Sequence, residues 1–299
     1  MAIVDALSEG VRIALRNWPV LIIDLVVALV NCAGFFIFVL LPVAAILLVA
    51  GLSPFIIADL HSHEALIRQI PWVMSLALAF LLLYTAVMLC LGLFVLAGTV
   101  GVVVRTVESP EEGFSLASFL SLAKRDFFPF LNYSALTGGI GILIALFALV
   151  GGYFIKNLLD YLKGYSLALS YFVGIFAAGV GAALILALIV WLLSVTFYGF
   201  IELSHNRQGV METFQKVQSF IKKDASSVVF FLIAGGIYLL LNLVFTALGF
   251  TFRFTPFGLL LTLPYQFLTY MVSALTGLWF VSSLVSYYLG GREQGVGGS

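Results

Sequence analysis

The chain has 299 residues, of which 63% are hydrophobic and only 9% are charged. Soluble domains carry about 25% charged residues, so this composition excludes a soluble globular protein and is typical of an integral membrane protein. The formal net charge is zero. No block of about five or six like charges occurs, and we therefore expect no nucleic-acid partner.

Six long apolar segments predict six membrane spans, at 20–48, 72–104, 128–154, 166–200, 227–250 and 260–289. Each is long enough for a helix to cross a bilayer core, which takes about 20 residues. Lipid offers no hydrogen-bond partners to the backbone, and the absence of period-two alternation favours helices over barrel strands. The sequence therefore predicts an all-α fold, a polytopic integral membrane bundle of six transmembrane helices. Pro42 should kink or end the first of them.

The charges predict the orientation of the bundle. Six spans place both termini on one side, and that side holds ten of the fourteen cationic residues: Arg12, Arg16, Arg105, Lys124, Arg125, Arg207, Lys216, Lys222, Lys223 and Arg292. Cationic loops stay cytoplasmic, so we expect both termini in the cytoplasm and the chain in the plasma (inner) membrane of a prokaryote. The first residues mix both signs of charge and lead into a very long apolar run, so no cleaved secretory signal is expected.

A short amphipathic segment precedes the first, third and fifth spans, and we expect three short interfacial helices there. The first segment places Val4, Leu7, Val11 and Ala14 on one helical face. Similar apolar sets are Leu116, Phe119, Leu120 and Ala123, and Val210, Phe214, Val217 and Ile221. For the second segment, Ser109, Pro110 and Glu112 predict a helix start near residue 110.

Each amphipathic segment ends in a cation followed by Asn or Asp: Arg16–Asn17, Arg125–Asp126 and Lys223–Asp224. Each pair marks a corner, at which an interfacial helix is expected to turn into a membrane span. The cations at these corners complement the helix dipole and can reach lipid phosphates. The residues expected at anionic lipid headgroups are Arg16, Lys124, Arg125, Lys222 and Lys223. The recurrence predicts three pseudo-repeats, 1–104, 105–201 and 202–291, within a single transmembrane domain, 1–291, followed by a flexible tail, 292–299.

Two stretches resemble a known group of proteins. "FYGFIELSHNRQGVMETFQKVQSFIKKDASSVVFFLI" and the Asn-Trp-Pro opening of "RIALRNWPVLII" are similar to six-span bacterial and archaeal membrane proteins of the YciC-like group. They are also similar to the membrane domain attached to some glycerophosphodiester phosphodiesterases. The resemblance implies an integral-membrane module with no catalytic residues to carry over. Phosphodiesterase activity is not implied, because no soluble stretch of about 250 residues exists to form the barrel.

One dense polar cluster, "DLHSHEALIR", places four metal-ligand residue types within six positions: Asp59, His61, His63 and Glu64. Two alternate histidines can reach one ion from an extended or looped backbone, and the carboxylates could complete its shell. The alternative is that these are solvated residues of an external loop. The sequence leaves both interpretations open.

Asp24 is the ionisable residue placed inside a predicted span, with Asn31 one helical heptad further on. An intramembrane acid is costly and is by default a functional hypothesis, here a proton or cation relay. The alternative is an interior hydrogen bond or snorkelling toward the headgroups. In either case we expect Asp24 to face protein rather than lipid.

No nucleophile with an evident base, phosphate-binding glycine loop or metalloprotease motif is present, so we expect neither an enzyme nor a bound cofactor. We expect a nonenzymatic membrane module, a scaffold or accessory subunit that contacts lipid headgroups through its interfacial helices. The alternative is a transporter or permease with a cavity between hairpins near Asp24. Expected partners are anionic lipids and a membrane-protein partner or a second copy of the chain.

Overall fold

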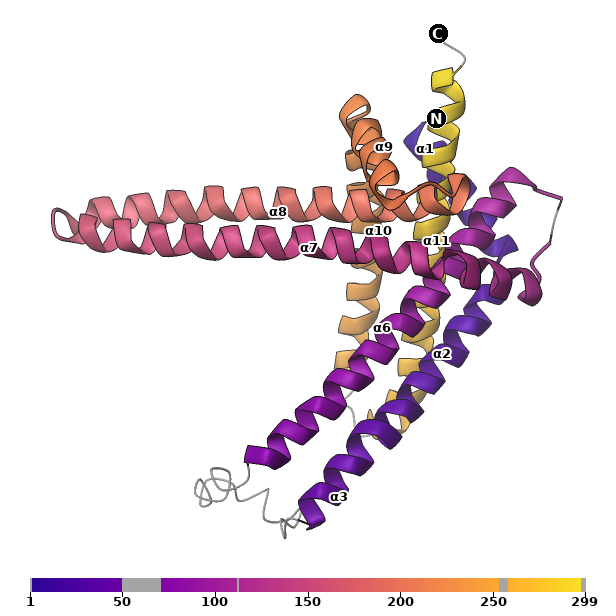
Figure 1. Ribbon diagram of the computed structural model, residues 1–299, viewed down its shortest axis with the longest axis horizontal. Coiled ribbons are helices and arrows are strands. Elements are labelled where there is room, and N and C mark those ends of the chain that lie inside the picture. The colour runs from indigo at the N-terminus through magenta and orange to yellow at the C-terminus, as the bar shows by residue number, and fades with distance from the viewer. Residues whose placement is uncertain (1, 50–70, 112, 253–257, 297–299) are drawn as a thin grey trace. The chain divides into compact units, whose positions relative to one another are not determined.

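The computed structural model describes residues 2–49, 71–111, 113–252 and 258–296, and in this part of the chain it contains helices and no strand. The elements are α1 (Ile3–Arg16), α2 (Pro19–Phe35), the π-helical segment η1 (Phe36–Leu40), α3 (Leu41–Val49), α6 (Pro71–Glu108), α7 (Leu116–Lys163), α8 (Leu167–Asn206), α9 (Val210–Lys223), α10 (Ser226–Phe252) and α11 (Gly258–Val296) (Figure 1). The all-α prediction is confirmed. α11 is helical as far as Val296, which includes part of the segment predicted as a tail.

Within the described residues, six helical segments are long and apolar enough to cross a membrane: Pro19–Ala45, Ser75–Glu108, Leu116–Lys163, Leu167–Asn206, Ser226–Phe250 and Pro264–Gly291. They correspond one by one to the six predicted spans. By length and composition, the chain is therefore an integral membrane protein with six candidate transmembrane helices.

The chain divides into two compact units. The smaller unit, 19–96, contains α2, η1, α3 and the first part of α6. Its two long helices meet where the Tyr84 hydroxyl donates to the Asn31 carbonyl oxygen at 2.7 Å and the Tyr84 ring meets Phe35 edge-on. Pro42 was expected to interrupt its helix, and the interruption is the π-helical segment η1, which ends two residues before it. Proline has no N–H and cannot donate the helical hydrogen bond to the Phe38 carbonyl.

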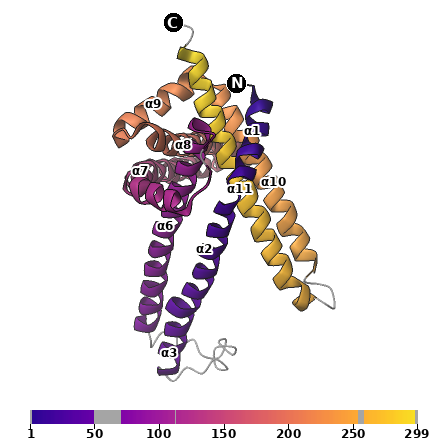
Figure 2. The ribbon, with the colours of Figure 1, turned by 90° about the vertical axis from the view of Figure 1, so that its right-hand side faces the viewer.

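The larger unit, 1–18 and 97–299, contains two long antiparallel hairpins. α7 and α8 lie side by side in Figure 1, and α10 and α11 form the second pair in Figure 2. The first pair is held by stacked rings of Phe130 and Phe200, 4.4 Å apart, and by the Tyr133 hydroxyl, which donates to the Val195 carbonyl at 3.0 Å. Aromatic packing of this kind orients helices more specifically than aliphatic contact does.

The predicted start of the second amphipathic helix near residue 110 is wrong. Ser109 ends α6, where its N–H bonds the Arg105 carbonyl at 2.8 Å, and α7 begins only at Leu116 after the N-cap residue Ser115. Glu112 lies outside the described residues. α7 then continues through Asp126 to Lys163 without a break, so the second amphipathic segment is the first part of a 48-residue helix rather than a separate one.

Candidate functional site

α1 has three distinct faces. Its buried face is made of small residues and one isoleucine, namely Ala6, Gly10, Ile13 and Ala14. A second face carries the polar residues Asp5, Glu9, Arg12 and Arg16. The third is an exposed apolar stripe that continues past the helix: Val4, Val11, Leu15 and Trp18. The apolar set predicted from sequence is therefore divided, since Val4 and Val11 are 73% and 46% exposed whereas Ala14 is buried.

The buried face of α1 packs along the C-terminal half of α11. The Trp279 indole N–H donates to the Leu7 carbonyl at 3.2 Å. A Cβ atom added at Gly10 would lie 2.8 Å from Ser283 Cα, closer than packed carbon atoms approach. The small residues of α1 therefore permit close helix contact, and this is why its larger apolar residues are on the outside.

The first of the three predicted corners is closed by an amide. Asn17 is buried at the end of α1, and its Nδ2 donates to the Thr106 hydroxyl at 3.1 Å. Thr106 lies on the last turns of α6 and also donates to the Val102 carbonyl of its own helix at 2.9 Å. A buried polar pair with mutual partners fixes one helix end against another.

The second corner is closed by an ion pair. Asp126 is 3% exposed and accepts from Arg125 Nε at 2.5 Å and from Arg125 Nη2 at 2.6 Å. The Ser204 hydroxyl on α8 donates to the same carboxylate at 2.8 Å, and Arg125 also donates to the Ser204 carbonyl at 3.2 Å. Bidentate guanidinium–carboxylate geometry is the strongest form of such a contact.

The third corner is closed by a tyrosine. Asp224 follows α9, and its carboxylate accepts from the Tyr287 hydroxyl of α11 at 3.1 Å and from the Ser226 N–H at 3.1 Å. The Ser227 hydroxyl donates to the Asp224 carbonyl at 2.7 Å. In each corner the Asn or Asp therefore forms a hydrogen bond to the second helix of the hairpin that follows it. Asn17 contacts α6, Asp126 contacts α8 and Asp224 contacts α11.

The amphipathic segments join these hairpins into a closed cycle of contacts, which we call the contact cycle. The start of α7 packs on α6, where Phe119 covers Gly98. α9 packs on α8, where the rings of Phe220 and Tyr198 are 5.5 Å apart, and α1 packs on α11. The residues three and seven positions before each corner are buried in all three segments: Ala14 and Gly10, Ala123 and Phe119, Ile221 and Val217. The three packing contacts differ in extent, since α1 follows α11 most closely.

A cavity of about 220 Å³ lies on the polar side of α1. It is lined by two arginines and one glutamate of α1, by the end of α6 and by α11: Glu9, Arg12, Ile13, Arg16, Thr106, Val107, Pro110, Ser286, Leu289 and Gly290. Arg12 pairs with Glu9 at 2.5 Å. With two cations and one anion, the described lining has a formal excess of positive charge and is suited to an anionic group.

A fully buried carboxylate lies beside the third amphipathic segment. Glu202 of α8 accepts from the Tyr288 hydroxyl at 3.0 Å and from Asn206 Nδ2 at 2.9 Å, and Lys216 of α9 lies 3.4 Å away. The Glu202 side chain is 0% exposed, whereas that of Lys216 is 41% exposed. The network therefore ties α8, α9 and α11 together and leaves Lys216 only partly available to solvent.

The predicted headgroup cations divide into two kinds. Arg16, Lys124, Lys222 and Lys223 are exposed. Arg125 is different, because its guanidinium is bound to Asp126 and to the Ser204 carbonyl. Its position next to a buried acid makes it an internal partner of the corner, and its contact with a headgroup stays a prediction.

The remaining sequence candidates lie in the smaller unit or outside the described residues. Asp24 is half-buried and interacts within the chain, while Asn31 is held by Tyr84. Asp59, His61, His63 and Glu64 all lie outside the described residues. Cys32 and Cys90 are free and exposed.

Several residues of the contact cycle were missed by sequence reasoning, namely Thr106, Ser204, Tyr287, Glu202 and Tyr288. Their signal in the sequence is weak, because each is a single polar residue near the end of an apolar run. Their importance depends on which helix they face. No protein-family model, curated protein or solved structure matches the chain, so the resemblance to the YciC-like group remains a prediction.

Proposed function

We propose that the chain is a nonenzymatic membrane module, a scaffold or accessory subunit, whose contact cycle lies at the cytoplasmic headgroup level and binds anionic lipid. The observation that carries the proposal is the three-faced α1. One face packs on α11, one is polar and carries charges of both signs, and one is an exposed apolar stripe ending in Trp18. A helix with this division is stable when it lies in the plane of a membrane surface, and tryptophan is enriched at that depth.

The exposed cations of the other two segments support the same placement. Lys124 follows the buried Ala123, and Lys222 and Lys223 follow the buried Ile221, so the cations lie next to faces that are fixed on protein. Together with the cavity that contains Arg12 and Arg16, they form cationic sites at equivalent places in three pseudo-repeats of an inner-membrane protein with cytoplasmic termini. The recurring corner contacts support this threefold arrangement.

The proposal is tested by native mass spectrometry of the detergent-solubilised protein with phosphatidylglycerol and, separately, phosphatidylcholine. A Lys124→Gln, Lys222→Gln, Lys223→Gln triple variant and an Arg12→Gln, Arg16→Gln double variant should each bind less phosphatidylglycerol. Each cation near an anionic surface contributes about 1 kcal/mol, which is about fivefold in affinity at low salt. Phosphatidylcholine binding should not change.

The matched control is a Lys156→Gln, Lys163→Gln variant, whose cations lie at the opposite end of α7. It should retain phosphatidylglycerol binding. The effect of the other two variants should also fall as salt is raised, since exposed charges are screened within about 10 Å at 0.1 M. Equal losses in the control and in the triple variant would contradict the placement of the headgroup site.

A further inference from the structure

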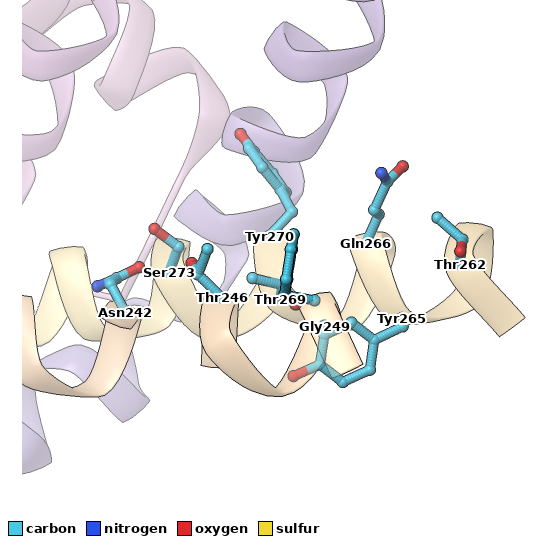
Figure 3. A pocket seen from close by; sticks show the side chains of 10 residues that line it. Asn242, Thr246, Gly249, Thr262, Tyr265, Gln266, Thr269, Tyr270 and Ser273 are labelled. Carbon is cyan, nitrogen blue, oxygen red and sulfur yellow. The ribbon is translucent and has the colours of Figure 1, made fainter. Parts of the chain in front are cut away.

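The half of the α10–α11 hairpin that lies away from Asp224 contains a groove with several polar residues in its lining, which the contact cycle does not use. The groove has a volume of about 450 Å³. On α10 it begins at Asn242, which lies 18 positions after the corner at Asp224. In Figure 3 the labelled side chains run along the two helices from Asn242 and Ser273 at one end to Gln266 and Thr262 at the other. The volume falls in the range of roughly 300–1,000 Å³ that is usual for small-molecule sites.

Polar residues of both helices face this groove. On α10 they are Asn242 and Thr246, and on α11 they are Gln266, Thr269 and Ser273, each set at helical spacing. All the polar groups are hydroxyls or amides. Among the described residues that line the groove, none is Asp, Glu, Lys, Arg or His.

Pairing of the two helices accounts for only part of this polarity. Asn242 Nδ2 bridges to the Thr276 hydroxyl at 3.4 Å, and the Tyr265 hydroxyl donates to the Phe245 carbonyl at 2.5 Å. One such amide is enough to bridge two transmembrane helices. Neither contact involves Thr269 or Gln266, and these two polar residues therefore need another reason to occupy an apolar hairpin.

Thr269 shows an unmet hydrogen bond in the groove. Its Oγ1 is buried and has no hydrogen-bond partner among the described residues. Thr276, two turns later in the same helix, instead donates its hydroxyl to the Val272 carbonyl at 2.8 Å. A buried hydroxyl without a partner is unfavourable, so Thr269 is suited to bind a polar group that enters the groove.

We propose that this groove binds the uncharged, hydroxyl-rich headgroup of a neutral glycolipid. Hydroxyls and amides both donate and accept, as the hydroxyls of a sugar do, whereas a phosphate or an ammonium group would find no opposite charge in the described lining. The lipid source follows from the surroundings. Phe250 lines the groove, and Phe267 and Leu268 lie next to its polar residues on α11; all three side chains are at least half exposed and can contact acyl chains.

The proposal is tested by native mass spectrometry of the full chain in a polyoxyethylene detergent, because a maltoside detergent would present a competing sugar. The probes are monoglucosyl diacylglycerol, diacylglycerol without the sugar, phosphatidylglycerol and free glucose. The glucosyl lipid should bind at least about tenfold more tightly than diacylglycerol, since two or three hydrogen bonds separate them. Phosphatidylglycerol and free glucose should not displace it.

A Gln266→Leu, Thr269→Val variant should lower glucosyl-lipid binding to the level of diacylglycerol. The matched control is Thr196→Val, which removes a helical hydroxyl that donates only to its own Leu192 carbonyl at 2.8 Å. If the double variant is not monodisperse, Thr246→Leu fills the groove from the other helix and should have the same effect.

Three results would overturn the proposal: equal binding of glucosyl lipid and diacylglycerol, displacement by phosphatidylglycerol, or unchanged binding in both groove variants. Binding of free glucose as tight as that of the glucosyl lipid would overturn the assignment to a lipid. The groove residues do not overlap the headgroup cations, so these results are separate from those that test anionic-lipid binding at the contact cycle.

Discussion

The hydroxyl of Ser204 donates a 2.8 Å hydrogen bond to the carboxylate of Asp126, across 78 residues of sequence. This contact links the C-terminal end of α8 to the first part of α7. Because Asp126 is almost fully buried, the carboxylate depends on Ser204 and Arg125 for the hydrogen bonds that water would otherwise supply.

Replacing Asp126 should destabilise the protein strongly. Asp126→Ala leaves the Arg125 guanidinium without its carboxylate, and we expect a loss of about 2–3 kcal/mol, less than for a fully buried pair because a third of Arg125 is exposed. Asp160→Ala, which breaks an exposed pair with Lys163, is the control and should have little effect. Thermal unfolding in detergent measures both, and similar losses would show that the corner contact is not important for stability.

Two glycines of the same hairpin should respond in opposite directions to alanine. A Cβ at Gly199 would overlap the Tyr133 ring, so Gly199→Ala should lower the unfolding temperature. A Cβ at Gly138 meets nothing within 4 Å. Gly138→Ala should therefore raise stability by about 0.5–1 kcal/mol through helix propensity. A stabilising Gly199→Ala substitution would mean that the helices are not in close contact there.

The buried carboxylate of Glu202 should make Tyr288 important for stability. Tyr288→Phe removes one hydrogen bond to a charged acceptor and is expected to cost about 1.5–3 kcal/mol. Tyr161→Phe removes an exposed Tyr161–Tyr165 contact and should be nearly neutral. The free energy of unfolding in denaturant distinguishes the two. A neutral Tyr288→Phe substitution would show that water or another group satisfies Glu202.

Asp24→Asn tests the transport alternative. The variant should fold like the parent protein, because asparagine keeps the size and hydrogen-bonding capacity of the side chain. Proton flux into liposomes under an imposed pH gradient should be the same for both proteins if the chain is a scaffold. Faster flux through the parent protein than through Asp24→Asn would favour a proton relay and a transport function.

The histidine cluster outside the described residues remains testable in solution. Zinc titration of the solubilised protein should give binding that a His61→Ala, His63→Ala double variant loses, because both imidazoles would serve as ligands. Lys156→Gln, on a different predicted outer loop, is a suitable control. Equal zinc binding by the double variant would reject the metal site.

The six helices could be predicted from the sequence, because length and lack of charge are sufficient to identify a membrane span. The three corners were also marked, since a cation followed by Asn17, Asp126 or Asp224 interrupts an apolar sequence. One residue has a further role that was not predicted. Arg125, expected at lipid headgroups, is also the hydrogen-bond partner of the buried Asp126.

The contacting face of α1 could not be predicted from amphipathic spacing. Spacing separates polar from apolar positions, but it does not separate an apolar face that packs on protein from one that contacts lipid. In α1 the small residues Ala6 and Gly10 face α11, and the larger Val4 and Val11 face outward. The polar groove was missed for a similar reason, since Thr246 and Thr269 are 23 positions apart and become one site only when α10 and α11 pair.

The closure of the contact cycle has a consequence for biosynthesis. The Trp279 indole and the Leu7 carbonyl are 272 positions apart, so α1 packs on a helix that is synthesised much later. Contacts this distant in sequence form late, after loop-closure entropy has been overcome by earlier pairings. During synthesis the small-residue face of α1 is therefore uncovered, and a chain that ends before α11 should remain open to quality-control proteases while its first two hairpins are already inserted.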